Sequence, residues 1–119
     1  MSPLPVLADQ SLKGPASALT FVANLMVDGL SIKLVTSGGL RNAHQIDAIT
    51  RAAKMTTKIS CFIEPALLIS ASFSLALSSP NVAYRDLDSY LDLIHDSSKA
   101  GLKLEDGWLV ATDVYGLGY

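Results

Sequence analysis

Apolar and polar positions along residues 1–88 repeat a simple pattern, in which a short apolar run is followed by a segment of helical length. Four such runs predict β-strands, at residues 5–8, 30–35, 59–63 and 82–85. The segments between them predict helices, at residues 16–26, 40–53 and 65–78. Because strands that alternate with helices pair in parallel, the pattern predicts an α/β fold.

The two predicted helices nearest the N-terminus differ in polarity. Residues 15–27 contain no charged side chain, and a helix without a polar face is usually covered on both sides. Residues 40–53 are clearly amphipathic, with polar side chains such as Asp47 mostly off the apolar stripe. The stripe that we expect to be buried consists of Leu40, Ala43, Ile46, Ile49 and Ala53.

The pattern changes after Asp88. Residues 90–94 predict one helical turn or irregular chain, and residues 102–110 predict a small hairpin about an Asp-Gly turn. Before that point, the strand centres recur at close to the ~30 residues per βα unit of an eight-stranded barrel. The prediction is therefore about four βα units of a TIM-type barrel, followed by a hairpin and a tail. The strand centres lie near Leu7, Ile32, Cys61 and Tyr84.

Polar residues fall at or just beyond the C-terminal ends of the four predicted strands. They are Asp9, Lys33, Glu64 and the pair Asp86 and Asp88. Barrels and open α/β sheets place their active sites at this edge, so we expect a catalytic constellation here. Each carboxylate taken singly is also compatible with a helix cap or a solubilising loop residue.

Lys33 lies inside an otherwise apolar run. Side chains alternate along a strand, so Lys33 faces away from Ile32 and Leu34, together with Ser31 and Val35. In a covered sheet this lysine would point into the protein, where it could serve as a proton acceptor. On this stretch alone, an edge strand whose lysine reaches water is the favoured alternative.

Composition sets limits on the class of protein. The chain has 119 residues, half of them apolar, so one domain with a real core is expected. A formal net charge of −2 gives no electrostatic signature for nucleic acid or an anionic membrane. Cys61 is the single cysteine, which predicts a reducing compartment and, by default, the cytoplasm. Residues 65–80 are too few for a spanning helix, and residues 1–5 lack the basic region of a signal peptide.

Five short segments, in order, resemble the C-terminal barrel half of the enolase superfamily, in its mandelate racemase and muconate lactonizing branch, and most closely the dipeptide epimerases. Residues 5–11 are similar to the strand that ends in Asp-Glu-Ser, and residues 32–39 to the lysine strand with its Ser-Gly-Gly turn. Residues 61–64 are similar to a Cys-Met-Ile-Glu segment, residues 86–88 to Asp-Leu-Asp-Gly, and residues 116–118 to Pro-Gly-Leu-Gly.

The resemblance implies removal of a proton alpha to a carboxylate, assisted by Mg²⁺. By resemblance, Asp9 is one of three carboxylate ligands of the metal and Lys33 is one of two opposed lysine bases. Glu64 orients the substrate or hydrogen-bonds the intermediate, and Asp86 and Asp88 receive the ammonium of a dipeptide. Carboxylate oxygens suit Mg²⁺, and paired carboxylates suit a cation.

The departures from the family matter as well. Gln10 stands where the family has Glu, and Ser89 stands where it has Gly.

The resemblance implies that residues 1–88 carry βα units, that residues 89–119 form a C-terminal segment, and that the capping domain and first barrel half are absent. We therefore expect weak Mg²⁺ binding and little activity from the isolated chain. Exposed edges predict a homo-oligomer or pairing with a complementary barrel half.

Several alternatives remain open at this stage. Muconate cycloisomerase or o-succinylbenzoate synthase chemistry is the second candidate within the family, and a non-catalytic oligomeric scaffold is the candidate outside it. His44 and His95 lack partners at metal-ligand spacing and are expected at the surface. Cys61 is expected to be a buried small side chain, and Trp108 a packing residue.

Overall fold

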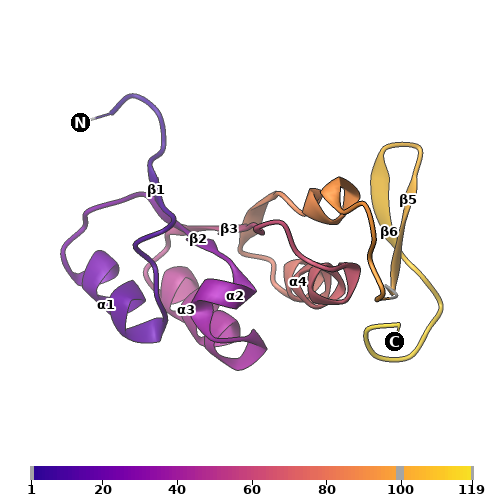
Figure 1. The fold of residues 1–119 in the computed structure, drawn as a ribbon. Helices are drawn as coiled ribbons and strands as arrows, with labels where there is room; N and C mark the ends of the chain where they lie inside the picture. Colours follow the sequence, from indigo (N-terminus) through magenta and orange to yellow (C-terminus); the bar gives the residue numbers. More distant parts are fainter. Residues whose placement is uncertain (1, 99–100, 119) are drawn as a thin grey trace.

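The computed structural model describes residues 2–98 and 101–118 and has the α/β fold that the sequence predicts (Figure 1). Four strands form one parallel sheet in the order β1-β2-β3-β4. Each strand follows its neighbour in sequence, which is the arrangement of successive βα units in a barrel. The strands are β1 (Leu7–Ala8), β2 (Gly29–Ile32), β3 (Thr56–Ile59) and β4 (Val82–Arg85).

The α-helices lie along one face of this sheet, below it in Figure 1, and the opposite face is free of them. They are α1 (Pro15–Ala23), α2 (Leu34–Ser37), α3 (Leu40–Ala52) and α4 (Ala66–Ser78). The core is formed where the apolar side chains of the strands meet the helices. Its fully buried members include Leu30, Ile32, Ile46, Ile59, Ile69 and Leu75.

The bounds of β2 and β3 differ most from the prediction. β2 ends at Ile32, and Lys33 already precedes the short helix α2, so Val35 lies exposed on a helix instead of in a strand. β3 occupies Thr56–Ile59, where the sequence suggested a connection, and the predicted run 59–63 lies mostly beyond it. β-branched threonines favour a strand, and Asn81 Nδ2 donates a hydrogen bond of 2.8 Å to Thr57 Oγ1.

Gly29 explains how closely β2 and β3 approach at their first paired residues. Its register partner is Thr56, and a Cβ at position 29 would overlap the carbonyl oxygen of Thr56. A second glycine pair, Gly38 and Gly39, has φ of 85° and 96° and makes the turn between α2 and α3. Glycine adopts these angles at little cost, which accounts for the pair between the second strand and its helix.

Two expectations about the helices are wrong. Asp47 of α3 is buried, and its Oδ2 accepts a hydrogen bond of 2.6 Å from the hydroxyl of Ser79. Buried polar groups require such partners. Helix α1 is covered on one side only: Ala18 is its fully buried residue among those described, while Leu19 is 56% exposed. The uncharged sequence of this helix therefore leaves apolar surface open.

The C-terminal region consists of a short 3₁₀ helix, η1 (Ser89–Asp92), and a hairpin of β5 (Leu102–Glu105) and β6 (Trp108–Ala111). The predicted Asp-Gly turn is confirmed, since Asp106 and Gly107 both have positive φ, as a two-residue hairpin turn requires. Among the described residues, no helix combines the length and apolar character that crossing a membrane requires.

The N-terminus of α4 is capped by residues far along the chain. Ala66 N–H donates to Asp96 Oδ2 at 2.6 Å, and Leu67 N–H donates to Ser98 Oγ at 3.1 Å. The first N–H groups of a helix have no partner within the helix, so these side chains satisfy them. The segment after η1 is thereby held against the helix that follows β3.

Candidate functional site

The open face of the sheet carries two rows of polar side chains. Ser31, Lys58 and Tyr84 are register partners on β2, β3 and β4, and Asp9 extends this row because it follows Ala8, the partner of Leu30. Side chains two residues apart share a face, so the next row is formed by Lys33, Ser60 and Asp86. Backbone hydrogen bonds from Ser60 N–H to Ile32 O and from Asp86 N–H to Ile59 O continue the ladder to this second row.

Three polar contacts link one row to the other. Lys33 Nζ donates to Asp9 Oδ1, and Lys58 Nζ donates to Asp86 Oδ2 at 2.8 Å. Between these ion pairs, the hydroxyl groups of Ser31 and Ser60 are hydrogen-bonded at 2.8 Å in a buried position. The open face thus contains two charged centres separated by a neutral hydrogen bond.

Lys33 belongs to the more enclosed centre. Its side chain is 8% exposed, whereas that of Asp9 is 44% exposed and remains accessible at the edge. The Lys33 ammonium also lies 5.2 Å from the centre of the Phe62 ring, at cation–π distance. Because β2 is an inner strand and the lysine is buried, the edge-strand alternative for Lys33 is wrong.

Glu64 lies next to this ion pair and is almost fully buried, at 3% exposure. Phe62 N–H donates to Oε1 at 3.0 Å, while Oε2 has no hydrogen-bond partner among the described residues. Burial raises the pKa of Glu64, and the Phe62 hydrogen bond and the positive charge of Lys33 offset only part of that increase. We refer to Asp9, Lys33 and Glu64 as the Lys33 cluster.

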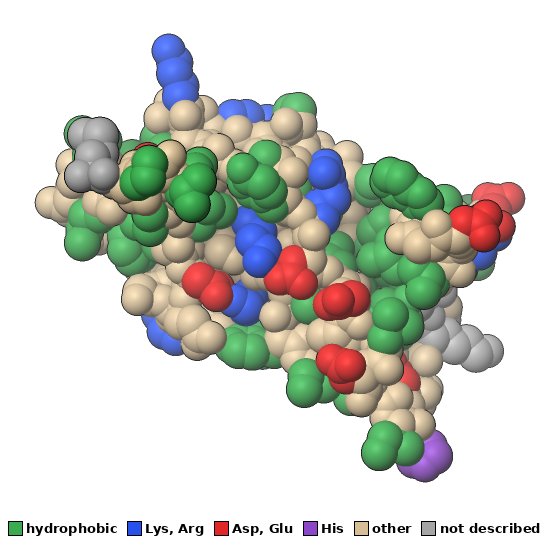
Figure 2. All heavy atoms as spheres, turned by 90° about the horizontal axis from the view of Figure 1, so that it is seen from above, with side chains coloured by type: hydrophobic (Ala, Val, Ile, Leu, Met, Phe, Trp, Pro, Cys, Tyr) green, Lys and Arg blue, Asp and Glu red, His purple; other side chains and the backbone are tan. Residues whose placement is uncertain are grey.

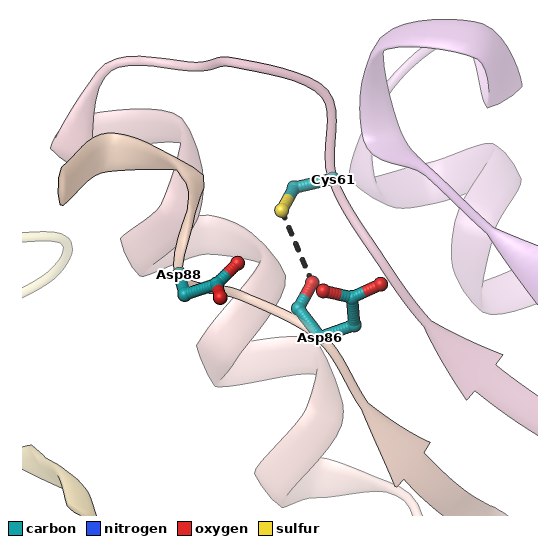
Figure 3. Close-up of side chains that lie close together, drawn as sticks. All are labelled: Cys61, Asp86 and Asp88. Atoms are coloured by element: carbon teal, nitrogen blue, oxygen red, sulfur yellow. Dashed lines mark hydrogen bonds between the residues drawn. The ribbon is translucent and has the colours of Figure 1, made fainter. Parts of the chain in front are cut away.

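Asp86 and Asp88 belong to a second, exposed centre at the end of β4. Figure 3 shows the Cys61 thiol pointing to the backbone carbonyl of Asp86, to which it donates a hydrogen bond of 3.1 Å. One possible ligand atom from each of these three residues lies within 4.8 Å of the others. We refer to Lys58, Cys61, Asp86 and Asp88 as the Lys58 cluster. Cys61 is half-buried, not fully buried as its apolar run suggested.

The structure therefore brings the five predicted site residues to one edge of the sheet, but in two groups. Asp9, Lys33 and Glu64 come together, and Asp86 and Asp88 lie beside a different lysine. The sequence pattern does not mark Lys58, because residues 56–58 lie between the predicted helix at residues 40–53 and the predicted strand at residues 59–63. Correct assignment of the strand would have revealed it, since alternation from Ser60 places Lys58 on the same face.

A cleft of about 550 Å³ opens over this face. Figure 2 shows acidic and basic side chains gathered in the centre of the open face, with apolar side chains on either side. The cleft is thus polar where the two ion pairs lie and apolar at its margins. Its lining consists of Pro5, Leu7, Asp9, Ser31, Lys58, Tyr84, Arg85 and Asp86.

The donor groups differ in how well they suit Mg²⁺. Asp9 offers an accessible carboxylate oxygen at the edge of the cleft, which is the type of ligand that Mg²⁺ prefers. One carboxylate cannot complete an octahedral oxygen shell, so Asp9 fits as a single member of a larger ligand set. The Cys61 group fits poorly, because a thiol is a soft ligand and Asp86 already pairs with Lys58.

A parallel βα array with charged groups at the carboxyl ends of its strands is the arrangement of part of an α/β-barrel, and such barrels carry their active sites at that edge. Comparison with known proteins agrees, since the family model described as "Enolase C-terminal domain-like" matches residues 1–119. The chain belongs to this family.

Several curated relatives of the chain are described as epimerases. The chain is 39% identical to an L-Lys-D/L-Arg epimerase of Methylococcus capsulatus over 114 residues, which are 95% of this chain and 32% of the relative. It is 34% identical to an L-Ala-D/L-Glu epimerase of Bacteroides thetaiotaomicron over 119 residues, which are 98% of this chain and 29% of that protein. The chain thus spans about a third of the length of the curated relatives that it matches.

Solved structures give the same result. The substrate-liganded L-Ala-D/L-Glu epimerase from Bacillus subtilis matches with a TM-score of 0.92 at 28% identity, over 98% of this chain and 33% of that one. The dipeptide epimerase from Methylococcus capsulatus, complexed with Mg and the dipeptide L-Arg-D-Lys, matches with a TM-score of 0.89 at 38% identity. That match covers 94% of this chain and 32% of the other, so the predicted fold, the C-terminal half of such a barrel, is confirmed.

Proposed function

We propose that this chain supplies the C-terminal part of the active site of a dipeptide epimerase-like enzyme, which removes a proton alpha to a carboxylate. The observation that carries the proposal is the meeting of Asp9, Lys33 and Glu64 at one edge of the sheet. Each follows a different strand, yet Lys33 bonds to Asp9 and its charge acts on Glu64. Relatives described as dipeptide epimerases support the substrate class.

Lys33 is the proposed base. In its neutral amine form it takes the alpha proton of the substrate on Nζ, and the resulting ammonium is stabilised by the adjacent carboxylate of Asp9. The side chain is held by burial and by the Phe62 ring, so it keeps one direction with respect to the cleft. A base in a fixed position loses little entropy when the substrate reacts.

Glu64 is the proposed hydrogen-bonding group for the substrate carboxylate or the intermediate formed from it. The raised pKa keeps the side chain protonated to a higher pH than an ordinary glutamic acid. In its protonated form Glu64 donates a hydrogen bond, and Oε2 is the atom that lacks a partner among the residues described.

Asp86 and Asp88 are the proposed acceptors for the substrate ammonium. Both side chains are exposed beside the cleft, so a substrate can reach them without a change of fold. A dipeptide would therefore be held at two points. Its reacting carbon would lie nearer Lys33, and its ammonium would lie nearer the end of β4. Paired carboxylates bind an ammonium through charge-assisted hydrogen bonds.

Asp9 is the proposed ligand for Mg²⁺. When bound, Mg²⁺ would stabilise the negative charge that develops on the substrate carboxylate as the proton leaves. Asp9 faces both the cleft and Lys33, so it can hold a cation and still accept a hydrogen bond from the lysine. Asp9 would supply one oxygen ligand and Lys33 one base, so this function requires further ligands and a second base from a complementary barrel half or a second copy of the chain.

We further propose that residues 1–88 and 89–119 act as one partial barrel domain, which a complementary barrel half or a second copy of the chain completes. Within the described residues, β1 pairs with β2 alone and β4 pairs with β3 alone, so each has one open edge. An open strand edge is a template for another chain. The exposed apolar side of α1 offers further surface for such a partner.

Reconstitution tests this function. The chain is mixed with the segment of the Methylococcus capsulatus relative that precedes the matched region, and an L-dipeptide is followed by NMR in D₂O with Mg²⁺. We expect deuterium to replace the alpha proton only in the mixture, and the Lys33→Met chain to give no exchange above background. If the two parts bind each other but exchange equals that of Lys33→Met, the chain is a scaffold and the proposal fails.

A further inference from the structure

We propose that Lys58 is a specificity-determining residue, which makes the cleft favour dipeptides with an uncharged N-terminal side chain over those that begin with Lys or Arg. The inference rests on the proposed function, in which Asp86 and Asp88 receive the substrate ammonium. It goes further because it names the side chain that sets the charge at that end of the cleft.

The position of Lys58 is the first step of the argument. It lies in the middle of β3, in register with Ser31 and Tyr84, and all three line the cleft. Its side chain is 32% exposed, so the aliphatic part is largely covered while the ammonium reaches the cleft. A strand in the centre of a sheet fixes the direction of this side chain better than a loop would.

The contact with Asp86 is the second step. Lys58 Nζ lies 2.8 Å from Asp86 Oδ2. Asp86 is itself held in place, since its N–H donates to Ile59 O at 3.0 Å and its carbonyl accepts a hydrogen bond from the Cys61 thiol. A substrate ammonium that approaches Asp86 must therefore share the carboxylate with Lys58 or use Oδ1.

The charge of the group is the third step. Asp86 and Asp88 together carry two negative charges, and Lys58 reduces the total to one. A single substrate ammonium matches that charge, whereas a basic N-terminal residue brings a second cation close to Lys58. Without Lys58, two carboxylates would suit a doubly charged N-terminal residue.

The expected size of the effect follows from the exposure of the group. Charge interactions between partly exposed side chains are weak, and their loss changes binding by about fivefold. Salt screens them further, so the preference should decrease at high ionic strength. The effect is small enough that it must be measured as a ratio between two ligands on the same protein.

The test is a chemical-shift titration of the ¹⁵N-labelled full chain with L-Ala-L-Ala and with L-Lys-L-Ala at equal ionic strength. The unmodified chain should bind L-Ala-L-Ala about fivefold more tightly. Lys58→Met should abolish or reverse this preference. Lys58→Arg keeps the charge and should retain it, which separates charge from shape. Lys103→Met is the matched control, because Lys103 pairs with Glu105 on the hairpin at 3.2 Å and should leave the ratio unchanged.

The outcomes separate this inference from the function on which it rests. An unchanged ratio in Lys58→Met, or a Lys58→Arg chain that behaves like Lys58→Met, overturns the role of Lys58 while dipeptide binding stands. If N-acetyl-L-Ala-L-Ala binds as tightly as L-Ala-L-Ala, the ammonium site at Asp86 and Asp88 is wrong. If neither free dipeptide binds any of the four chains, the dipeptide cleft and the inference fail together.

Discussion

The Lys33 cluster and the Lys58 cluster lie on the same face of one sheet, yet they differ in exposure. In the first, Lys33 and Glu64 are buried and Asp9 alone is accessible. In the second, Asp86 and Asp88 are exposed and the lysine is partly so. Buried charges interact strongly and are held in place, whereas exposed charges are screened and exchange partners readily. The first arrangement suits proton transfer and the second suits reversible binding of a charged ligand.

The sharpest test of this difference is to remove each lysine in the reconstituted enzyme. We expect Lys33→Met to reduce alpha-proton exchange by ~10²–10⁴-fold, the usual effect of losing a positioned general base. Lys58→Met should change the rate with a neutral dipeptide far less. Both are measured by NMR in D₂O, and circular dichroism verifies that each variant is folded. Equal losses in the two variants would contradict the division into two centres.

The hydrogen bond between the clusters is the next target. Ser60→Ala leaves the buried hydroxyl of Ser31 without its partner, and such a loss costs about 1–3 kcal/mol of unfolding free energy. Replacing both serines by alanine removes the donor and the acceptor together and should cost less than the single change. Urea unfolding measures both values. If the double variant loses as much unfolding free energy as the two single variants together, the two hydroxyl groups act independently.

Glu64 should make the stability of the folded chain depend on pH. Its folded-state pKa is raised above the unfolded value, so the folded state binds the proton more tightly and stability falls as the pH rises through the raised pKa. In Glu64→Gln this decrease should be missing. Lys33→Met should raise the pKa of Glu64 further, because the charge of Lys33 lowers it. Unfolding curves across pH and ¹³C NMR of the carboxyl group measure the two effects.

Asp96 should have the smallest effect on stability, and its pH dependence should have the opposite sign to that of Glu64. The hydroxyl of Ser98 and the N–H groups of Ala66 and Ser98 hold the pKa of Asp96 below its usual value. Its contribution to stability is therefore present above the unfolded pKa and is lost as the pH falls through the folded one. Asp96→Asn should be less stable at neutral pH and should approach the unmodified chain in acid. A constant difference between the two at every pH would exclude the cap as its source.

The sequence was a good guide to the elements and to the residues at their ends. The fourth strand of the parallel sheet is found at Val82–Arg85 as predicted, and α4 ends at Ser78. Turn residues and apolar runs are local signals, so these boundaries do not depend on distant parts of the chain. The alternation of strands and helices is also a local signal. It places at one edge of the sheet the residues that follow the strands, namely Asp9, Lys33, Glu64, Asp86 and Asp88.

The pairing of the charged groups could not be predicted from the sequence. It depends on which residues are register partners, and between β3 and β4 the register shifts at Thr57 and Lys58. That irregularity brings Lys58 level with Tyr84, from which it reaches Asp86. The burial of Asp47 cannot be predicted for a similar reason, since its partner Ser79 is 32 residues away along the chain.

The borrowed cap of α4 has a consequence for the order in which the chain acquires its structure. Ala66 receives its side-chain acceptor from a residue 30 positions later, so the start of the helix is incomplete until that later segment has left the ribosome. Contacts of such long sequence separation form late and slow folding. During synthesis the helix after β3 should therefore fray at its first turn, and it should become firm only when the segment that carries Asp96 and Ser98 has been made and has folded back against it.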